Sequence, residues 1–200
     1  MKKFQGNPII YFFIVTVVIS TVFTSCALLD WLEDKPEYER EEEKKLYNLI
    51  MEYRAEKGLP VIPMSKSLNY VAKTHVKDLH KHFDLTNVRN CNSHSWSNKG
   101  RWTACCYSPD HSNAACMWNK PRELTSYKGN GYELVYTPGG ATSWKSDQIK
   151  AEKALSAWKY YRELNAVILN DSISQDQWKA IGIGVYKEYV SVWFGKEPDE

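Results

Sequence analysis

Four cysteines lie close together in the middle of this 200-residue chain, and they restrict how that part of it can fold. Cys91, Cys105, Cys106 and Cys116 fall inside the stretch 84–143, which is rich in Cys, Asn, Ser, Gly and Trp. In an oxidising compartment we expect two disulfides, each worth about 3 kcal/mol in the chain-entropy model. A bond between the neighbouring cysteines would be strained, so Cys91 pairs with one of them and Cys116 with the other. A four-thiolate zinc site is the alternative, disfavoured because adjacent cysteines do not form the usual C-x-x-C knuckle.

The N-terminus predicts export from the cytoplasm. Lys2 and Lys3 precede an apolar run at 9–23, which has the length of a signal-peptide core and is too short for a comfortable membrane span. Small residues then lead to Cys26, a pattern similar to a bacterial lipobox, in which the cysteine carries the lipid. We therefore expect a signal peptide at 1–25 and a lipoprotein, modified with palmitate, that this lipid anchors in the membrane at the bacterial cell envelope or surface. An uncleaved anchor helix is the alternative, and it also places the rest of the chain outside the cytoplasm.

Composition excludes two classes of protein. Hydrophobic residues make up 43% of the chain and charged residues 25%, which is too rich in core-forming residues for an intrinsically disordered protein. The 26 basic and 24 acidic residues nearly balance, whereas a nucleic-acid binder shows a basic stripe, so we expect no nucleic-acid partner. Charge dominates from Asp30 to Lys45, and this predicts a solvated tether at 26–45.

Hydrophobic periodicity predicts helices first and strands last. Apolar residues at helical spacing predict helices over about 39–57, from a cap at Ser65 to about Phe83, and from near Ser146, the last with Tyr161 on its buried side. The strands are expected where β-branched and aromatic residues concentrate, at 131–136, 181–186 and 189–194. This order of elements predicts the α+β class.

Several blocks of sequence, taken in order, resemble the CAP superfamily of cysteine-rich secretory proteins, antigen 5 and pathogenesis-related proteins, with its SCP-like bacterial members. The matching blocks are Leu46 to Arg54 with Gly58-Leu59-Pro60, Leu68 to His75 with Asp78, Ser93 to Trp96, Gly131-Tyr132-Glu133, Leu155 to Trp158, Ala166 to Asn170, and Ile181 to Tyr186. The resemblance implies a CAP (SCP-like) domain at 46–196, folded as a three-layer α-β-α sandwich with a central groove.

The resemblance also implies a set of groove residues. His94 and Glu133 match the first histidine and the strand glutamate of the family. The position of the second histidine holds Leu164, and that of the other glutamate holds Tyr161. A divalent metal, zinc or calcium, would therefore find few ligands here, unless Glu163 supplies a replacement oxygen.

His94 and Glu133 have two roles open to them. They either form an acid/base pair for hydrolysis or hydrogen-bond each other within the groove wall, and we favour the second because buried polar groups are paired for stability at least as often as for chemistry. His75 lies on the apolar stripe of its helix and is interpreted as a core histidine.

The expected function is therefore that of a non-catalytic binding or interaction module, with a metal-dependent or acid/base hydrolase as the alternative. Three tryptophans of the irregular stretch either belong to the core or line a groove for a small hydrophobic, glycan or peptide ligand: Trp96, Trp102 and Trp118.

Overall fold

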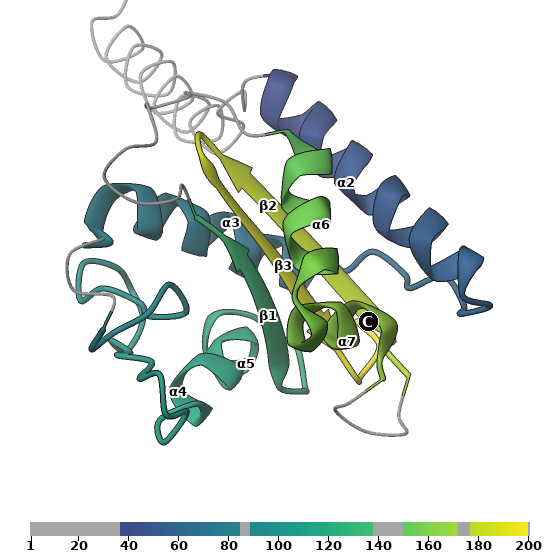
Figure 1. Cartoon of the computed structure of the whole chain (residues 1–200). Coiled ribbons are helices and arrows are strands. Elements are labelled where there is room, and N and C mark those ends of the chain that lie inside the picture. The colour runs from purple at the N-terminus through teal and green to yellow at the C-terminus, as the bar shows by residue number, and fades with distance from the viewer. Residues whose placement is uncertain (1–36, 85–88, 138–149, 172–176, 200) are drawn as a thin grey trace, which may run out of the picture. The chain divides into compact units, whose positions relative to one another are not determined.

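A computed structural model describes residues 37–84, 89–137, 150–171 and 177–199 (Figure 1). The predicted leader, Cys26 and most of the predicted tether lie outside the described residues. The chain divides into two units, Met1–Glu37 and Tyr38–Glu200, and the fold below is that of the second. Among the described residues, no helix combines the length and the hydrophobicity needed to cross a membrane.

A three-stranded antiparallel sheet forms the middle of the fold. Its strands are β1 (Gly131–Tyr136), β2 (Ala180–Tyr186) and β3 (Tyr189–Gly195), in the order β1-β3-β2. The register places Glu133 of β1 beside Trp193 of β3 and Gly182 of β2, so these three residues share one face of the sheet. The predicted strands are confirmed, because β-branched and aromatic runs favour a pleated, buried surface.

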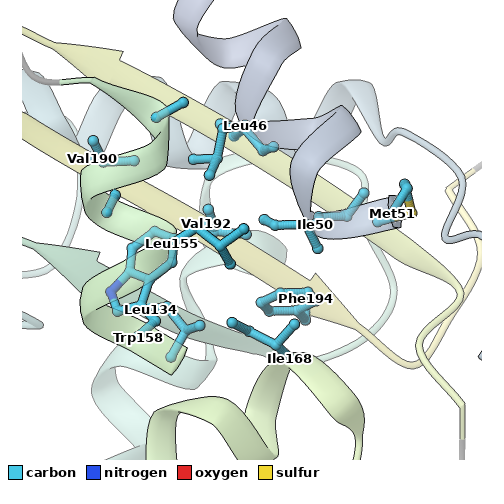
Figure 2. Packing of buried hydrophobic residues seen from close by; sticks show 14 of the residues in the cluster. Leu46, Ile50, Met51, Leu134, Leu155, Trp158, Ile168, Val190, Val192 and Phe194 are labelled. Atoms are coloured by element: carbon cyan, nitrogen blue, oxygen red, sulfur yellow. The ribbon is translucent and has the colours of Figure 1, made fainter. Parts of the chain in front are cut away.

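One face of the sheet carries the larger hydrophobic core. Helices α2 (Glu37–Glu56), α6 (Ala151–Tyr160) and α7 (Arg162–Leu169) cover this face, as Figure 1 shows. Figure 2 shows how side chains from the helices meet those of the strands; the labelled members of the cluster are Leu46, Ile50, Met51, Leu134, Leu155, Trp158, Ile168, Val190, Val192 and Phe194. Most of these residues are fully buried, which makes this cluster the main apolar contribution to stability.

Helix α3 (Lys66–His82) covers the other face of the sheet. The predicted cap is confirmed, because the Ser65 hydroxyl accepts a hydrogen bond from the backbone N–H of Leu68 at 2.9 Å. The helix backbone lies directly on β2, where Gly182 and Gly184 leave no space for a side chain. Two helical layers around one sheet make the predicted α-β-α sandwich of the α+β class, which the structure confirms.

The stretch between α3 and β1 is held by short helices and disulfides. It contains α4 (Ala115–Trp118) and α5 (Lys120–Leu124). The expectation of two disulfides is confirmed, and of the two pairings left open the structure has Cys91–Cys106 and Cys105–Cys116. Cys105 is buried against Trp96, so the second crosslink ties this stretch to the core below α3.

The predicted third helix differs from the observed one. Its start near Ser146 lies outside the described residues, and α6 is described from Ala151. The helix then stops at Tyr161, which has an extended backbone and separates α6 from α7. Tyr161 is 55% exposed, so its predicted burial is wrong. Because of the break, the apolar face of α6 does not continue into α7 in the same direction. A hydrophobic periodicity counted over one continuous helix cannot reveal this change.

Helix α2 begins at Glu37, nine residues before the predicted start of the domain at 46. Acidic residues in its first turns accept hydrogen bonds from the fold rather than facing water. Glu42 accepts from the backbone N–H of Ala151 at 2.5 Å, and Glu43 accepts from that of Val185 at 3.1 Å. Residues 38–45 therefore lie in the same compact unit as the rest of the described fold.

Candidate binding site

A buried carboxylate lies at the centre of the site. The side chain of Glu133 is fully buried on the α3 face of β1 and accepts three hydrogen bonds. Oε1 accepts from His75 Nδ1 and from Ser191 Oγ, both at 2.5 Å, and Oε2 accepts from His94 Nδ1 at 2.9 Å. Burial would raise the pKa of Glu133, but His75 and His94 outweigh it and lower the pKa to about 2. Glu133 is therefore ionised at neutral pH.

His75 is the cation that balances this carboxylate. Its Nδ1 faces Glu133 and its Nε2 lies 3.0 Å from the backbone oxygen of Ser95. A carboxylate and a carbonyl both only accept, so each ring nitrogen must carry a proton. Burial would lower the pKa of His75, but the charge of Glu133 outweighs it and raises the pKa above 6.5. The sandwich thus encloses an imidazolium–carboxylate pair, which agrees with the prediction of a core histidine.

His94 is the part of this network that reaches solvent. Its side chain is 22% exposed, and its Nδ1–H donates to Glu133. This bond fixes the tautomer, so in the neutral ring Nε2 is the atom with the free lone pair. The ring of Tyr107 lies beside it, with centroids 5.2 Å apart. Among the described residues no partner of Nε2 is found, so His94 can accept a hydrogen bond from a ligand.

Trp96 forms the floor beneath His75. Its ring stacks on His75 with centroids 4.3 Å apart and planes within 5°, an arrangement that favours a cationic imidazole. The ammonium of buried Lys120 lies 5.5 Å from the Trp96 ring centroid and donates to Glu123 and to the carbonyl of Thr103. Contacts with His75 of α3 and with Lys120 of α5 therefore hold Trp96 in position.

The structure does not bring all predicted groove residues together. Tyr161, Glu163 and Leu164 belong to the layer of α6 and α7, and Leu164 packs into the core on the face of the sheet opposite Glu133. Tyr161 and Glu163 are exposed on that side. Glu163 therefore does not replace the missing ligand near His94, because the sheet lies between them.

The tryptophans predicted to line a ligand groove have different surroundings. Trp96 is buried and lines a cavity near the C-terminal end of α3. Trp102 is partly buried and packs edge-on against Trp96, whereas Trp118 lies against Tyr132 on the strand. Neither of these two is among the described residues that line the cavity.

The donor set does not suit a divalent metal. Both nitrogens of His75 and both oxygens of Glu133 are already hydrogen-bonded, which leaves His94 Nε2 as the one uncommitted ligand atom of these three side chains. Across the described ranges, no group of three or more His, Cys, Asp or Glu side chains is placed to hold a metal ion. A zinc or calcium site normally needs at least three protein ligands, so the residues present do not fit one.

Two residues of the site were missed by sequence reasoning as partners of Glu133. His75 was placed in the core without a partner, and Ser191 was not singled out. The signal for Ser191 is weak, since it is the one polar residue in the run Tyr-Val-Ser-Val-Trp-Phe of β3. Only the register shows this: Ser191 lies two residues from Trp193, the partner of Glu133, and therefore on the same face of the sheet, where its hydroxyl donates to the carboxylate.

The fold of this chain is similar to the folds of several solved structures. No family model matches the sequence, and no curated protein matches it. Solved structures do match: a cysteine-rich secretory protein from Staphylococcus aureus has a TM-score of 0.52 at 13% identity, covering 82% of this chain and 40% of that protein. An extracellular protein of Bacillus anthracis containing an SCP domain has a TM-score of 0.51 at 16% identity, with 80% and 41% covered.

An outer surface protein of Borrelia burgdorferi is similar over most of its own length. It has a TM-score of 0.51 at 15% identity, covering 78% of this chain and 93% of that protein. The chain spans about two fifths of the length of the two proteins from Staphylococcus and Bacillus. At these identities the likeness establishes the fold, which is that of SCP (CAP) domains, as the sequence resemblance predicted.

Proposed function

We propose that this chain is an exported SCP (CAP) domain protein that acts as a non-catalytic binding module, with His94 as the ligand-facing residue of the site. The observation that carries the proposal is the saturation of Glu133. Its carboxylate has three donors, no exposed surface and a pKa of about 2, so it is a poor general base at neutral pH. The ion pair with His75 then serves to join α3, β1 and the disulfide-bearing loop.

One observation favours an acid/base hydrolase as the second candidate. The bond from His94 Nδ1 to Glu133 orients the imidazole and leaves Nε2 toward solvent, which is how a carboxylate prepares a histidine for proton transfer. A nucleophile or a bound water would have to lie within about 3.2 Å of Nε2. The ring of Tyr107 lies beside that of His94, and its hydroxyl is hydrogen-bonded to His111 at 2.7 Å.

The two candidates differ in a turnover assay. The wild-type protein and a His94→Ala, Glu133→Ala double variant are incubated with panels of peptides, esters and glycans. A binding module gives no turnover with either protein, while wild-type turnover that disappears in the double variant would overturn the proposal. His94→Gln serves as a milder variant, because it removes the imidazole and leaves the buried pair of His75 and Glu133 intact.

The proposed location has its own experiment. We propose that a lipid on Cys26 anchors the chain at the cell envelope. Cells expressing the wild-type chain and a Cys26→Ala variant are labelled with radioactive palmitate and extracted with detergent. Label in the detergent phase that is lost in the variant supports lipidation, whereas equal partitioning of both proteins without label contradicts it.

A further inference from the structure

The outward side of α3 carries a row of lysines. Its members recur three to four residues apart, so they lie along one side of the helix, opposite the residues that pack on the sheet. The one acidic residue of the helix, Asp78, is buried and held by Ser97. The outward side of α3 therefore carries positive charge and no negative charge of its own. We call this row, about 22 Å long, the lysine stripe: Lys66, Tyr70, Lys73, Lys77 and Lys81.

Most lysines of the stripe have no acidic partner within the fold. Lys73 pairs with Glu43 of α2 at 3.2 Å. Lys66, Lys77 and Lys81 form no ion pair with any residue that the structure describes. Their ammonium groups are therefore available to an anionic partner outside the domain.

Two carboxylates border the stripe, one at each end, and both are engaged by other groups. Asp199 accepts hydrogen bonds from the Ser65 hydroxyl at 2.7 Å and from the backbone N–H of Ser67 at 2.8 Å. Glu188 lies 3.5 Å from Nδ1 of His80. Neither carboxylate is therefore placed as the counter-ion of a lysine in the stripe.

The C-terminal end of the stripe lies at the end of the domain where α2 begins. Glu39, in the first turn of α2, accepts a hydrogen bond from the backbone N–H of Lys187 at 3.4 Å. Lys187 and Glu188 form the turn between β2 and β3, and Glu188 is the residue that His80 of α3 contacts. The start of α2 and the end of α3 thus meet at the same turn.

We propose that the lysine stripe of α3 lies on the anionic phospholipid headgroups of the membrane that carries the chain. The position of that membrane rests on the lipid anchor proposed above, whereas the charge of the stripe does not depend on it. Ten residues, 27–36, separate Cys26 from α2, and a chain of that length spans at most about 36 Å. The membrane surface is therefore held within reach of the end of the domain where the stripe ends.

A row along a helix suits an extended surface better than a small anion, because its charges are spread and do not converge on one point. Each lysine close to an anionic membrane strengthens binding about fivefold, so a few lysines alone bind weakly. A tether raises the effective concentration of the surface and makes such a weak contact sufficient. Tyr70, 51% exposed among the lysines, is a residue that favours the headgroup region.

The test measures which lysines the membrane covers. The full chain is bound to vesicles of phosphatidylcholine, alone or mixed in equal parts with phosphatidylglycerol. Only the chain that sediments with the vesicles is analysed: its lysines are acetylated by an N-hydroxysuccinimide ester, and mass spectrometry gives the rate for each. We expect phosphatidylglycerol to slow acetylation of Lys66, Lys77 and Lys81 about threefold to tenfold, and salt at about 1 M to remove the effect.

Lys153 is the internal control for this measurement. It is exposed on α6, which begins near the first turns of α2 but belongs to the other helical layer. Its rate should be the same in both kinds of vesicle. Unchanged rates for the stripe, or equal slowing of Lys153, would overturn the proposal. A soluble polyphosphate, added to phosphatidylcholine vesicles at the same phosphate concentration, would also overturn it by slowing the stripe as much as phosphatidylglycerol does.

Variants locate the contact and separate it from lipidation. A Lys77→Gln, Lys81→Gln double variant should lose most of the protection of Lys66, whereas Lys153→Gln, Lys159→Gln, the same changes on exposed positions of α6, should keep it. The same loss in both double variants, or no loss in the first, would contradict the contact. The palmitate experiment on Cys26→Ala tests attachment alone, so a chain without palmitate but with protected stripe lysines would contradict the lipid and support the contact of α3.

Discussion

Glu133 contributes to this fold mainly through a charge that is never exposed to water. Replacing it by glutamine keeps the shape but leaves the buried imidazolium of His75 without its counter-ion. Removing one partner of a buried ion pair typically costs about 3–5 kcal/mol. We therefore expect Glu133→Gln to lower the free energy of unfolding in urea by this amount. Glu163→Gln, the same change at an exposed position of α7, should alter it by less than about 0.5 kcal/mol, and a similar effect of both changes would refute the buried pair.

The same pair predicts how stability depends on pH. The pKa of Glu133 falls from 4.5 to about 2 on folding, so its contribution is complete above pH 4.5 and is lost as pH falls through 2. The pKa of His75 rises above 6.5, so its contribution is complete below pH 6.5 and is lost as pH rises through the folded value. The melting temperature should therefore be highest between pH 4.5 and 6.5 and decline on both sides. In Glu133→Gln the acidic decline should be shallower, and parallel curves for both proteins would show that other groups set the pH dependence.

At the scale of elements, the outer edge of β2 is closed by side chains of α2 and α3 and by the backbone just before α3. Ile183 donates its backbone N–H to Asn69 of α3 at 2.8 Å, and Val185 donates to Glu43 of α2 at 3.1 Å. Ile181 donates to the carbonyl of Pro63 at 3.0 Å. An edge strand with its donors satisfied in this way is protected from pairing with another molecule.

Removing one of these acceptors should expose the edge. Asn69→Leu leaves the Ile183 N–H unpaired under α3, and an unsatisfied buried donor costs about 1–3 kcal/mol. We expect a lower free energy of unfolding and more self-association at high concentration, measured by urea denaturation and analytical ultracentrifugation. Asn69→Asp retains a side-chain acceptor and should restore most of the stability. If the aspartate variant is as unstable as the leucine variant, the volume of the side chain and not the hydrogen bond is responsible.

The elements that could be predicted from the sequence are those marked by a signal in their own residues, such as a β-branched run or a capping side chain. The strands β1, β2 and β3 are marked by β-branched and aromatic residues, and the start of α3 is marked by Ser65. The helix α2 was predicted to within two residues of its observed start, but the contacts of its first turns could not be predicted. Glu42 and Glu43 look solvated in a charged run, and their hydrogen-bond donors belong to Ala151 and Val185, more than 100 residues away. The break at Tyr161 was missed because the periodicity on either side of it is helical.

The site could be predicted only in part, because its contacts also join residues that lie far apart in the sequence. His94 and Glu133 came from the resemblance, and the structure joins them at 2.9 Å. The partnership of Glu133 with His75 depends on how closely α3 approaches the sheet, which Gly182 and Gly184 permit. Leu164, matched to a groove position by spacing, belongs to the opposite layer because the chain between α6 and α7 turns at Tyr161.

At the scale of the whole molecule, the first turns of α2 connect the two ends of the fold. Glu42 accepts a hydrogen bond from the first backbone N–H of α6, and Glu43 accepts one from a backbone N–H at the edge of β2. Residues before 46 therefore contact two elements that lie far away in the sequence. A protein that begins at residue 46 loses both acceptors and half of α2. Each orphaned donor costs about 1–3 kcal/mol, a large share of the 5–15 kcal/mol that stabilises a typical domain.

We therefore expect a chain starting at residue 37 to fold cooperatively, and one starting at residue 46 to melt at a much lower temperature or to remain unfolded. Thermal unfolding by circular dichroism and dispersion of the amide NMR signals compare the two proteins. Glu42→Gln and Glu41→Gln in the full chain provide matched variants, because Glu42 is buried against α6 whereas Glu41 is exposed. Glu42→Gln should destabilise and Glu41→Gln should not. Equal melting temperatures for the chains starting at 37 and 46 would return the domain boundary to residue 46 and make the contacts of Glu42 and Glu43 dispensable.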